Sequence, residues 1–142
     1  MAGFLGNFLH QIDAKGRLSL PASFRRGHED QSFVLTQRQN EALLLFPDKE
    51  WRGVQARLRD MSRRPEHRNR VLRATSMAVE VAPDKQGRIL IPDWMREAIG
   101  LTSEARVVGA LDHIEIWEPE SFSKIMLEDD DDSEDLLTSI VI

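Results

Sequence analysis

Two short segments place an arginine directly after a glycine and four residues after an aspartate. They read Asp13-Ala-Lys-Gly-Arg17 and Asp84-Lys-Gln-Gly-Arg88. An arginine side chain ends in a planar fork of five N–H donors, which suits phosphate oxygens or the edge of a guanine. A neighbouring glycine allows the backbone to approach a ligand closely. These segments therefore indicate either binding to phosphates or bases through Arg17 and Arg88, or ordinary surface arginines that flank a turn.

The two aspartates suit a structural role better than a catalytic one. A pair of carboxylates can act as general acid and base, but an aspartate that opens a turn also hydrogen-bonds its own backbone. We expect Asp13 and Asp84 to shape two tight turns, in which Gly16 and Gly87 can adopt positive φ without a steric penalty.

The two segments belong to a tandem duplication. Asp13 and Asp84 are 71 residues apart, which is half of the 142-residue chain. The same offset, without a gap, pairs apolar residues along both copies: Phe8 with Val79, Phe24 with Met95, Leu43 with Ile114, Leu45 with Ile116, Phe46 with Trp117, and Trp51 with Phe122. Each copy is expected to form a strand, a tight turn, a second strand, a short helix and then a further hairpin.

The repeat predicts an α+β fold, mainly β, in which two modules share one core. A module of about 50 residues buries too little surface to be stable alone, so we expect the halves to interlock with pseudo-twofold symmetry. The predicted organisation is listed in chain order: a first module at 1–50, an arginine-rich helical linker at 51–75, a second module at 76–127, and an acidic, disordered tail at 128–142.

The linker is expected to be helical and to break near Pro65. Its predicted inward residues are Leu58, Met61, Val71 and Leu72. The three tryptophans, Trp51, Trp94 and Trp117, are interpreted as core or interface residues.

Charge is unevenly distributed along a chain whose formal net charge is −5. Residues 128–135 hold seven acids and no base; without these, 17 of the 24 acidic residues remain against 19 basic ones. Residues 51–73 hold eight arginines against Asp60 and Glu66. This asymmetry indicates either a nucleic-acid partner with a tail that competes for the arginines, or a solvated helix face with a solvating tail. Charge alone leaves both open.

Several classes of function have no support in the sequence. The absence of cysteine excludes disulfides, thiolate metal sites and cysteine nucleophiles. The four histidines lack metal-site spacing, and there is no Walker motif, dinucleotide loop or nucleophile elbow. We therefore expect no enzyme, metal, cofactor or small-molecule substrate. No segment approaches the roughly 18 apolar residues of a membrane span, so we also expect no membrane association and a cytoplasmic location.

The paired motifs and their Leu-Ser-Leu-Pro and Ile-Leu-Ile-Pro continuations resemble the MraZ family, as does the linker segment 68–74. The resemblance covers roughly residues 3–127. It implies an AbrB-like swapped-hairpin fold with two modules per chain. It also implies a nucleoid-associated bacterial regulator of the division and cell-wall gene cluster, which forms closed homo-oligomeric rings on double-stranded DNA and binds repeated promoter elements.

By position, the resemblance implies DNA contacts from Arg17 and Arg88, with Lys15 and Lys85 nearby. The lysine of the second copy stands one position earlier in its motif than that of the first. The two copies are therefore expected either to contact DNA unequally or to do so without Lys85. The alternative function is an oligomeric scaffold that regulates a protein partner without specific DNA binding, because a fold does not settle a function.

Overall fold

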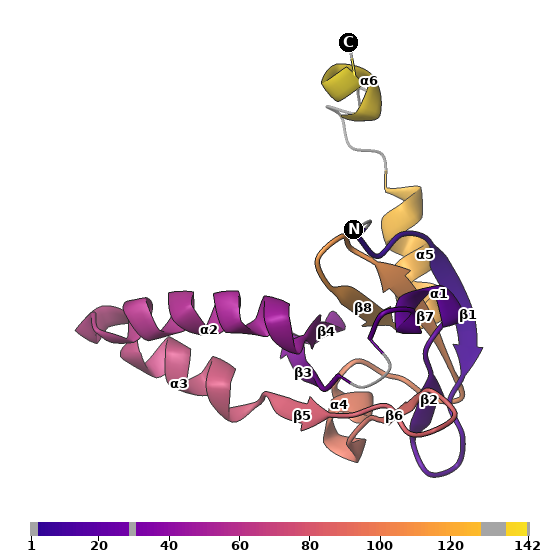
Figure 1. Cartoon of the computed structure of the whole chain (residues 1–142), viewed down its shortest axis with the longest axis horizontal. Helices are drawn as coiled ribbons and strands as arrows, with labels where there is room; N and C mark the ends of the chain where they lie inside the picture. The colour runs from indigo at the N-terminus through magenta and orange to yellow at the C-terminus, as the bar shows by residue number, and fades with distance from the viewer. Residues whose placement is uncertain (1–2, 29–30, 129–135, 142) are drawn as a thin grey trace.

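The computed structural model describes residues 3–28, 31–128 and 136–141. Each half contributes four strands and one short helix to the body of the protein (Figure 1). In the first half these are β1 (Asn7–Gln11), β2 (Arg17–Ser19), α1 (Ala22–Arg25), β3 (Phe33–Arg38) and β4 (Ala42–Pro47). In the second half they are β5 (Val79–Val81), β6 (Arg88–Leu90), α4 (Asp93–Ala98), β7 (Glu104–Gly109) and β8 (Ile114–Trp117).

Further helices connect and follow the two halves. The connection consists of α2 (Asp48–Ser62), a 3₁₀ turn η1 (Pro65–His67) and α3 (Arg68–Ser76). The second half is followed by α5 (Pro119–Leu127) and α6 (Leu136–Val141). The long helical pattern breaks at Pro65 as predicted, because proline cannot donate an N–H within a helix.

The strand order demonstrates that the halves interlock. A six-stranded antiparallel sheet has the order β1-β7-β8-β4-β3-β5, and a second sheet pairs β2 with β6. The order is symmetric: if each strand is replaced by its counterpart in the other half (β1 by β5, β3 by β7 and β4 by β8, and the reverse), the same order is obtained, read from the opposite edge. Both edge strands, β1 and β5, pair with the hairpin of the opposite half. The predicted two-module α+β fold is confirmed, with the same strand connectivity in each half.

The 71-residue offset does not hold for every strand. Phe33 pairs with Val81 as Ala105 pairs with His10, and Leu35 pairs with Leu45 as Val107 pairs with Ile116. The counterpart of a β3 residue therefore lies 72 positions later, in β7, whereas β1, β2 and β4 keep the offset of 71.

One core serves both halves. Equivalent residues from each copy are fully buried in it, and they are Leu18 and Ile89, Leu20 and Ile91, Phe24 and Met95, Leu43 and Ile114, and Leu45 and Ile116. Because each half supplies about half of these side chains, neither half could bury its apolar face without the other.

Helices α2 and α3 lie side by side and form an arm that extends from β3 and β4 (Figure 1). Val71 is buried as predicted, but Met61 and Leu72 are 37% and 65% exposed. The prediction of inward positions for these two was wrong, since a pair of helices packed against one hairpin has few positions that are covered on all sides.

The tryptophans and the tail have different environments. Trp117 is buried and Trp51 packs on Phe46 with ring centroids 5.7 Å apart, whereas Trp94 is 45% exposed. Within the predicted tail, residues 129–135, which make up nearly all of the acidic run 128–135, lie outside the described residues. The apolar side chains of α6 are exposed.

Candidate nucleic-acid interface

The turn between β1 and β2 is closed by the Asp13 carboxylate. Its Oδ1 accepts the backbone N–H groups of Lys15 and Arg17 at 3.0 and 2.9 Å. Its Oδ2 accepts the Nε–H of Arg17 at 2.7 Å. Gly16 has a φ of +86°, a conformation that favours glycine. A single carboxylate therefore fixes both the turn and the orientation of the arginine that follows it.

The turn between β5 and β6 repeats this arrangement. Asp84 Oδ1 accepts the backbone N–H groups of Gln86 and Arg88 at 2.9 and 3.0 Å, and Oδ2 accepts the Nε–H of Arg88 at 2.9 Å. Gly87 has a φ of +78°. Gln86 thus takes the structural place of Lys15, and Lys85 stands one residue earlier in its turn.

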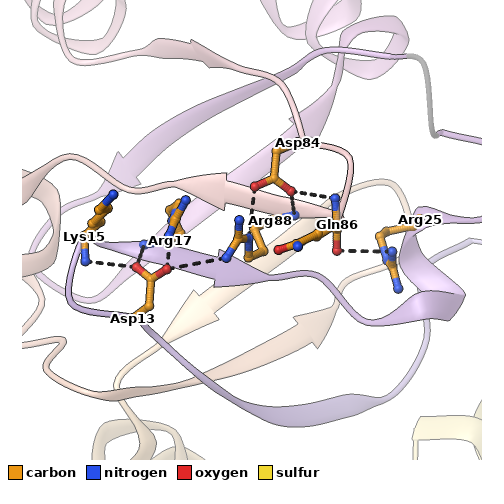
Figure 2. Close-up of polar contacts among 7 residues, drawn as sticks. All are labelled: Asp13, Lys15, Arg17, Arg25, Asp84, Gln86 and Arg88. Carbon is orange, nitrogen blue, oxygen red and sulfur yellow. Dashed lines mark hydrogen bonds and ion pairs between the residues drawn. The ribbon is translucent and has the colours of Figure 1, made fainter.

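The antiparallel pairing of β2 with β6 brings the two turns together (Figure 2). Ser19 pairs with Arg88, and Nη1 of Arg88 lies 3.8 Å from Oδ2 of Asp13. Asp13 therefore interacts with the arginine of each half. Two motifs 71 residues apart in the sequence form one cluster.

The aspartates are held in the ionised form. The hydrogen bond from the Arg17 backbone N–H is the main cause that lowers the pKa of Asp13 below its ordinary value of 3.8, although burial opposes it. The Arg88 backbone N–H lowers the pKa of Asp84 in the same way. Hydrogen bonds to a carboxylate favour its charged form. Each arginine therefore keeps a charged partner at neutral pH.

The guanidinium groups keep donors for an external ligand. The side chains of Arg17 and Arg88 are 33% and 27% exposed. Among the described residues, the two terminal nitrogens of Arg17 have no hydrogen-bond or ion-pair partner. With Nε bound to Asp13, this terminal pair can still donate two parallel hydrogen bonds to a phosphate or a guanine.

Sequence reasoning assigned no role to Arg25 and Arg96, which pack across the turns of the opposite halves. A Cβ at Gly87 would lie 2.3 Å from Cδ of Arg25, and one at Gly16 would lie 2.9 Å from Cζ of Arg96. Each arginine therefore lies directly against the backbone of the opposite turn, and a Cβ at either glycine would displace the end of that side chain. The signal in the sequence was the arginine found eight residues after the motif arginine in both copies.

Backbone hydrogen bonds reinforce this exchange between the halves. Leu20 donates its N–H to Gly87 O at 3.0 Å, and Ile91 donates its N–H to Gly16 O at 2.9 Å. Each turn is therefore held by the strand and helix of the other half, which makes the pair of turns a rigid unit.

The two predicted lysines do not join the hydrogen-bonded cluster through their side chains. Lys15 and Lys85 are exposed on their turns, and within the described part of the chain neither forms an ion pair. Around the turns, basic side chains outnumber acidic ones by three. The set consists of Lys15, Arg17, Arg25, Lys85, Arg88 and Arg96 against Asp13, Asp84 and Asp93. The surface around the turns is therefore basic although the whole chain is acidic.

The described residues contain no cluster of three or more His, Asp or Glu side chains placed to hold a metal ion. None of the helices in the described ranges combines the length and the apolar character needed to cross a membrane.

The fold and the turns together define a class: tandem-repeat swapped-hairpin proteins that present a pair of Asp–Arg turns. The model of the MraZ protein family, described as antitoxin-like, matches residues 4–74 and 75–138, which correspond to the two halves. The chain belongs to the MraZ family.

Curated relatives support this assignment. A transcriptional regulator MraZ of Syntrophobacter fumaroxidans is 41% identical over 118 residues, which is 80% of this chain and 78% of the relative. A transcriptional regulator MraZ of Desulforamulus reducens is 38% identical over 139 residues, which is 97% of both proteins. The resemblance seen in the sequence motifs therefore extends over nearly the whole chain.

Proposed function

We propose that this protein is a sequence-specific DNA-binding transcriptional regulator. The names of its relatives support a role in transcription. The observation that carries the proposal is the pairing of the two turns, in which Arg17 and Arg88 flank one aspartate with Arg88 Nη1 3.8 Å from Asp13 Oδ2. Two rigidly held guanidinium groups in one basic cluster suit a polyanion that presents hydrogen-bond acceptors at fixed positions, as the base edges of DNA do.

The shape of this unit fits double-stranded DNA. The strands β2 and β6 form a short antiparallel ribbon, and the major groove of B-DNA admits a two-stranded ribbon. The terminal donors of Arg17 then contact guanine edges or phosphates, while Asp13 prevents the guanidinium from rotating. Such bidentate contacts discriminate a correct from a wrong base by roughly 1–3 kcal/mol.

We propose further that several subunits bind together as a closed ring on repeated promoter elements. Two arginines per chain give weak binding, but linked sites make each later contact intramolecular. Exposed apolar side chains such as Leu5 and Leu9, at 62% and 45%, provide surface for contacts between subunits. By family resemblance, the proposed target is the promoter of the division and cell-wall gene cluster, and the proposed location is the cytoplasmic nucleoid.

The experiment is a fluorescence-anisotropy titration of the full chain against its own upstream region and against a random duplex. The test variants are Arg17→Ala and Arg88→Ala. The matched control is Arg63→Ala, at the end of α2 on the arm that leads away from β2 and β6 (Figure 1). We expect Arg17→Ala to lose most specific binding, Arg88→Ala to weaken it, and the control to retain it. Unchanged binding curves for both test variants would disprove the proposed site.

A further inference from the structure

The surroundings of Arg25 and Arg96 break the symmetry between the halves. Three corresponding positions differ in charge or polarity. Ala22 and Asp93, and Ala14 and Lys85, correspond at the 71-residue offset. His28 and Leu101 correspond because they donate their N–H groups to the carbonyls of Arg25 and Arg96. In each pair, the residue near Arg25 is the more basic or the less acidic of the two, so the surroundings of Arg25 are more positive than those of Arg96. The two arginines therefore occupy similar places in the fold but different electrostatic environments.

Arg96 is neutralised within its own helix. Its Nη2 donates to Oδ1 of Asp93, and its Nε donates to the carbonyl of Ile91 at 3.2 Å. The Arg96 side chain is only 20% exposed. Because a carboxylate neutralises Arg96 and a carbonyl accepts from its Nε, this guanidinium attracts an external anion only weakly.

Arg25 has no such partner. Ala22 stands where Asp93 stands in the other half, and within residues 3–28 and 31–128 no carboxylate forms an ion pair with Arg25. The Nε of Arg25 is shielded from solvent and has no hydrogen-bond partner among the described residues. Its Nη1 makes one long contact, 3.5 Å, with the Gln86 carbonyl. A half-buried guanidinium without an anion leaves N–H donors without acceptors, and this is unfavourable in free energy.

A pocket of about 400 Å³ opens beside this guanidinium. Its basic walls come from Arg25, His28 and Lys85, and its acidic wall from Asp84. Both oxygens of Asp84 already accept hydrogen bonds within their own turn. Asp84 is therefore committed to Arg88, and the pocket retains two cationic side chains that can bind an anion.

This pocket adjoins the cluster of turns. Hydrogen bonds and ion pairs link Arg17, Asp13, Arg88, Asp84, Gln86 and Arg25 in one continuous series, and Figure 2 shows Arg25 at its end. An extended polyanion that contacts Arg17 and Arg88 would therefore pass close to Arg25.

We propose that Arg25, together with Lys85, binds a phosphate group of the DNA backbone beside the contacts of Arg17 and Arg88, and that Arg96 does not. This inference rests on the proposed DNA-binding function. It assigns a use to the shifted lysine of the second copy: Lys85 serves the pocket, while Lys15 occupies the position of Gln86. Contact on one side only would give each subunit a fixed direction along the duplex.

The test exchanges the neutralising carboxylate between the halves. Ala22→Asp gives Arg25 the partner that Arg96 has, and Asp93→Ala removes it from Arg96. An acid in the first turn is favourable for a helix, so Ala22→Asp should fold. Ala22→Asn, of the same size but uncharged, is the matched control. Circular dichroism and light scattering establish that fold and oligomer are retained.

Affinity is measured against operator and random duplex over a salt series. The slope of log K against log salt is negative, and losing one phosphate contact makes it shallower by about 0.9 for each bound subunit. We expect Ala22→Asp to weaken binding to both duplexes by the same factor and to make this slope shallower. We expect Ala22→Asn to keep the wild-type slope, and Asp93→Ala to keep it or make it steeper.

The outcomes separate this inference from the proposed function. If Arg17→Ala abolishes binding but Ala22→Asp has the wild-type slope, the phosphate contact is wrong and the function stands. If the wild type binds neither duplex, both fail. A thermal-shift arm compares inorganic phosphate with chloride at equal ionic strength. Stabilisation of the wild type but not of Ala22→Asp, with unchanged DNA slopes, would assign the pocket to a free anion and overturn the proposal.

Discussion

Asp13 is shared by two arginines: its Oδ2 lies 2.7 Å from Nε of Arg17 in its own half and 3.8 Å from Nη1 of Arg88 in the other. Among the arginines of the described residues, Asp84 forms an ion pair with Arg88 alone. The two motifs look equivalent in the sequence, but the aspartate of the first interacts with two arginines and the aspartate of the second with one.

This inequality predicts unequal mutants. Asp13→Asn should weaken DNA binding more than Asp84→Asn, because it removes the charge that orients Arg17 and leaves Arg88 with one partner. Anisotropy titrations of the two single variants and the double variant measure the effect. Equal losses in the single variants, adding in the double variant, would show that the contact between Asp13 and Arg88 has no energetic weight.

The turn glycines should be more sensitive than a glycine with the same φ in open space. Gly87→Ala meets Cδ of Arg25 at 2.3 Å as well as the penalty of positive φ. Gly100, with a φ of +73° and nothing within 4 Å of an added Cβ, is the matched control. We expect Gly100→Ala to cost roughly 1 kcal/mol in the free energy of unfolding by urea, and Gly87→Ala to cost more, because the end of the Arg25 side chain must also move. Equal values would argue against tight packing of Arg25 on the turn.

Stability should fall in acid because of the two turn aspartates. Hydrogen bonds from the backbone N–H groups of Arg17 and Arg88 lower the folded-state pKa values of Asp13 and Asp84 below 3.8. The unfolded chain then binds more protons, so this contribution is complete above the ordinary pKa and is lost as the pH falls through the folded-state values. Urea unfolding between pH 6 and 2.5 measures it. The double variant Asp13→Asn/Asp84→Asn should show a shallower fall, and an unchanged slope would contradict the assignment.

Assembly should be independent of the DNA contacts. Light scattering at micromolar concentration is expected to give the mass of several subunits for the wild type. Arg17→Ala should keep the same mass, since Arg17 hydrogen-bonds within its own turn. A monomeric wild type would refute the ring, and a change of mass in Arg17→Ala would mean that loss of DNA binding reflects loss of assembly.

The sequence predicted features that depend on local chemistry or on repetition. The turns follow from aspartate and glycine at fixed spacing, and the shared core follows from the paired apolar positions. The register of β3 did not follow, because its counterparts in β7 lie 72 rather than 71 positions later and the ungapped alignment does not reveal this. The exposure of Met61 and Leu72 did not follow either, since helical periodicity does not reveal how little covers a two-helix arm.

The packing of Arg25 on Gly87 was beyond sequence reasoning for a different reason. It depends on which half supplies the neighbour of each turn, and that is set by the pairing of β2 with β6. The contrast between Ala22 and Asp93 was visible in the sequence, but it acquired a meaning only once Arg25 and Arg96 were placed.

The interlocked strand order also constrains how the chain can fold. Among the named strands, only the hairpins β3–β4 and β7–β8 pair within one half. The other pairings join residues 44 to 101 positions apart. Such a high contact order slows folding. During synthesis, the first half emerges with β1, β2 and one edge of β4 unpaired. β2 can pair only after β6 is made, and β1 and β4 can complete their pairing only after β7 and β8 are made. The first half expressed alone should complete its sheet only by pairing with a second copy of itself.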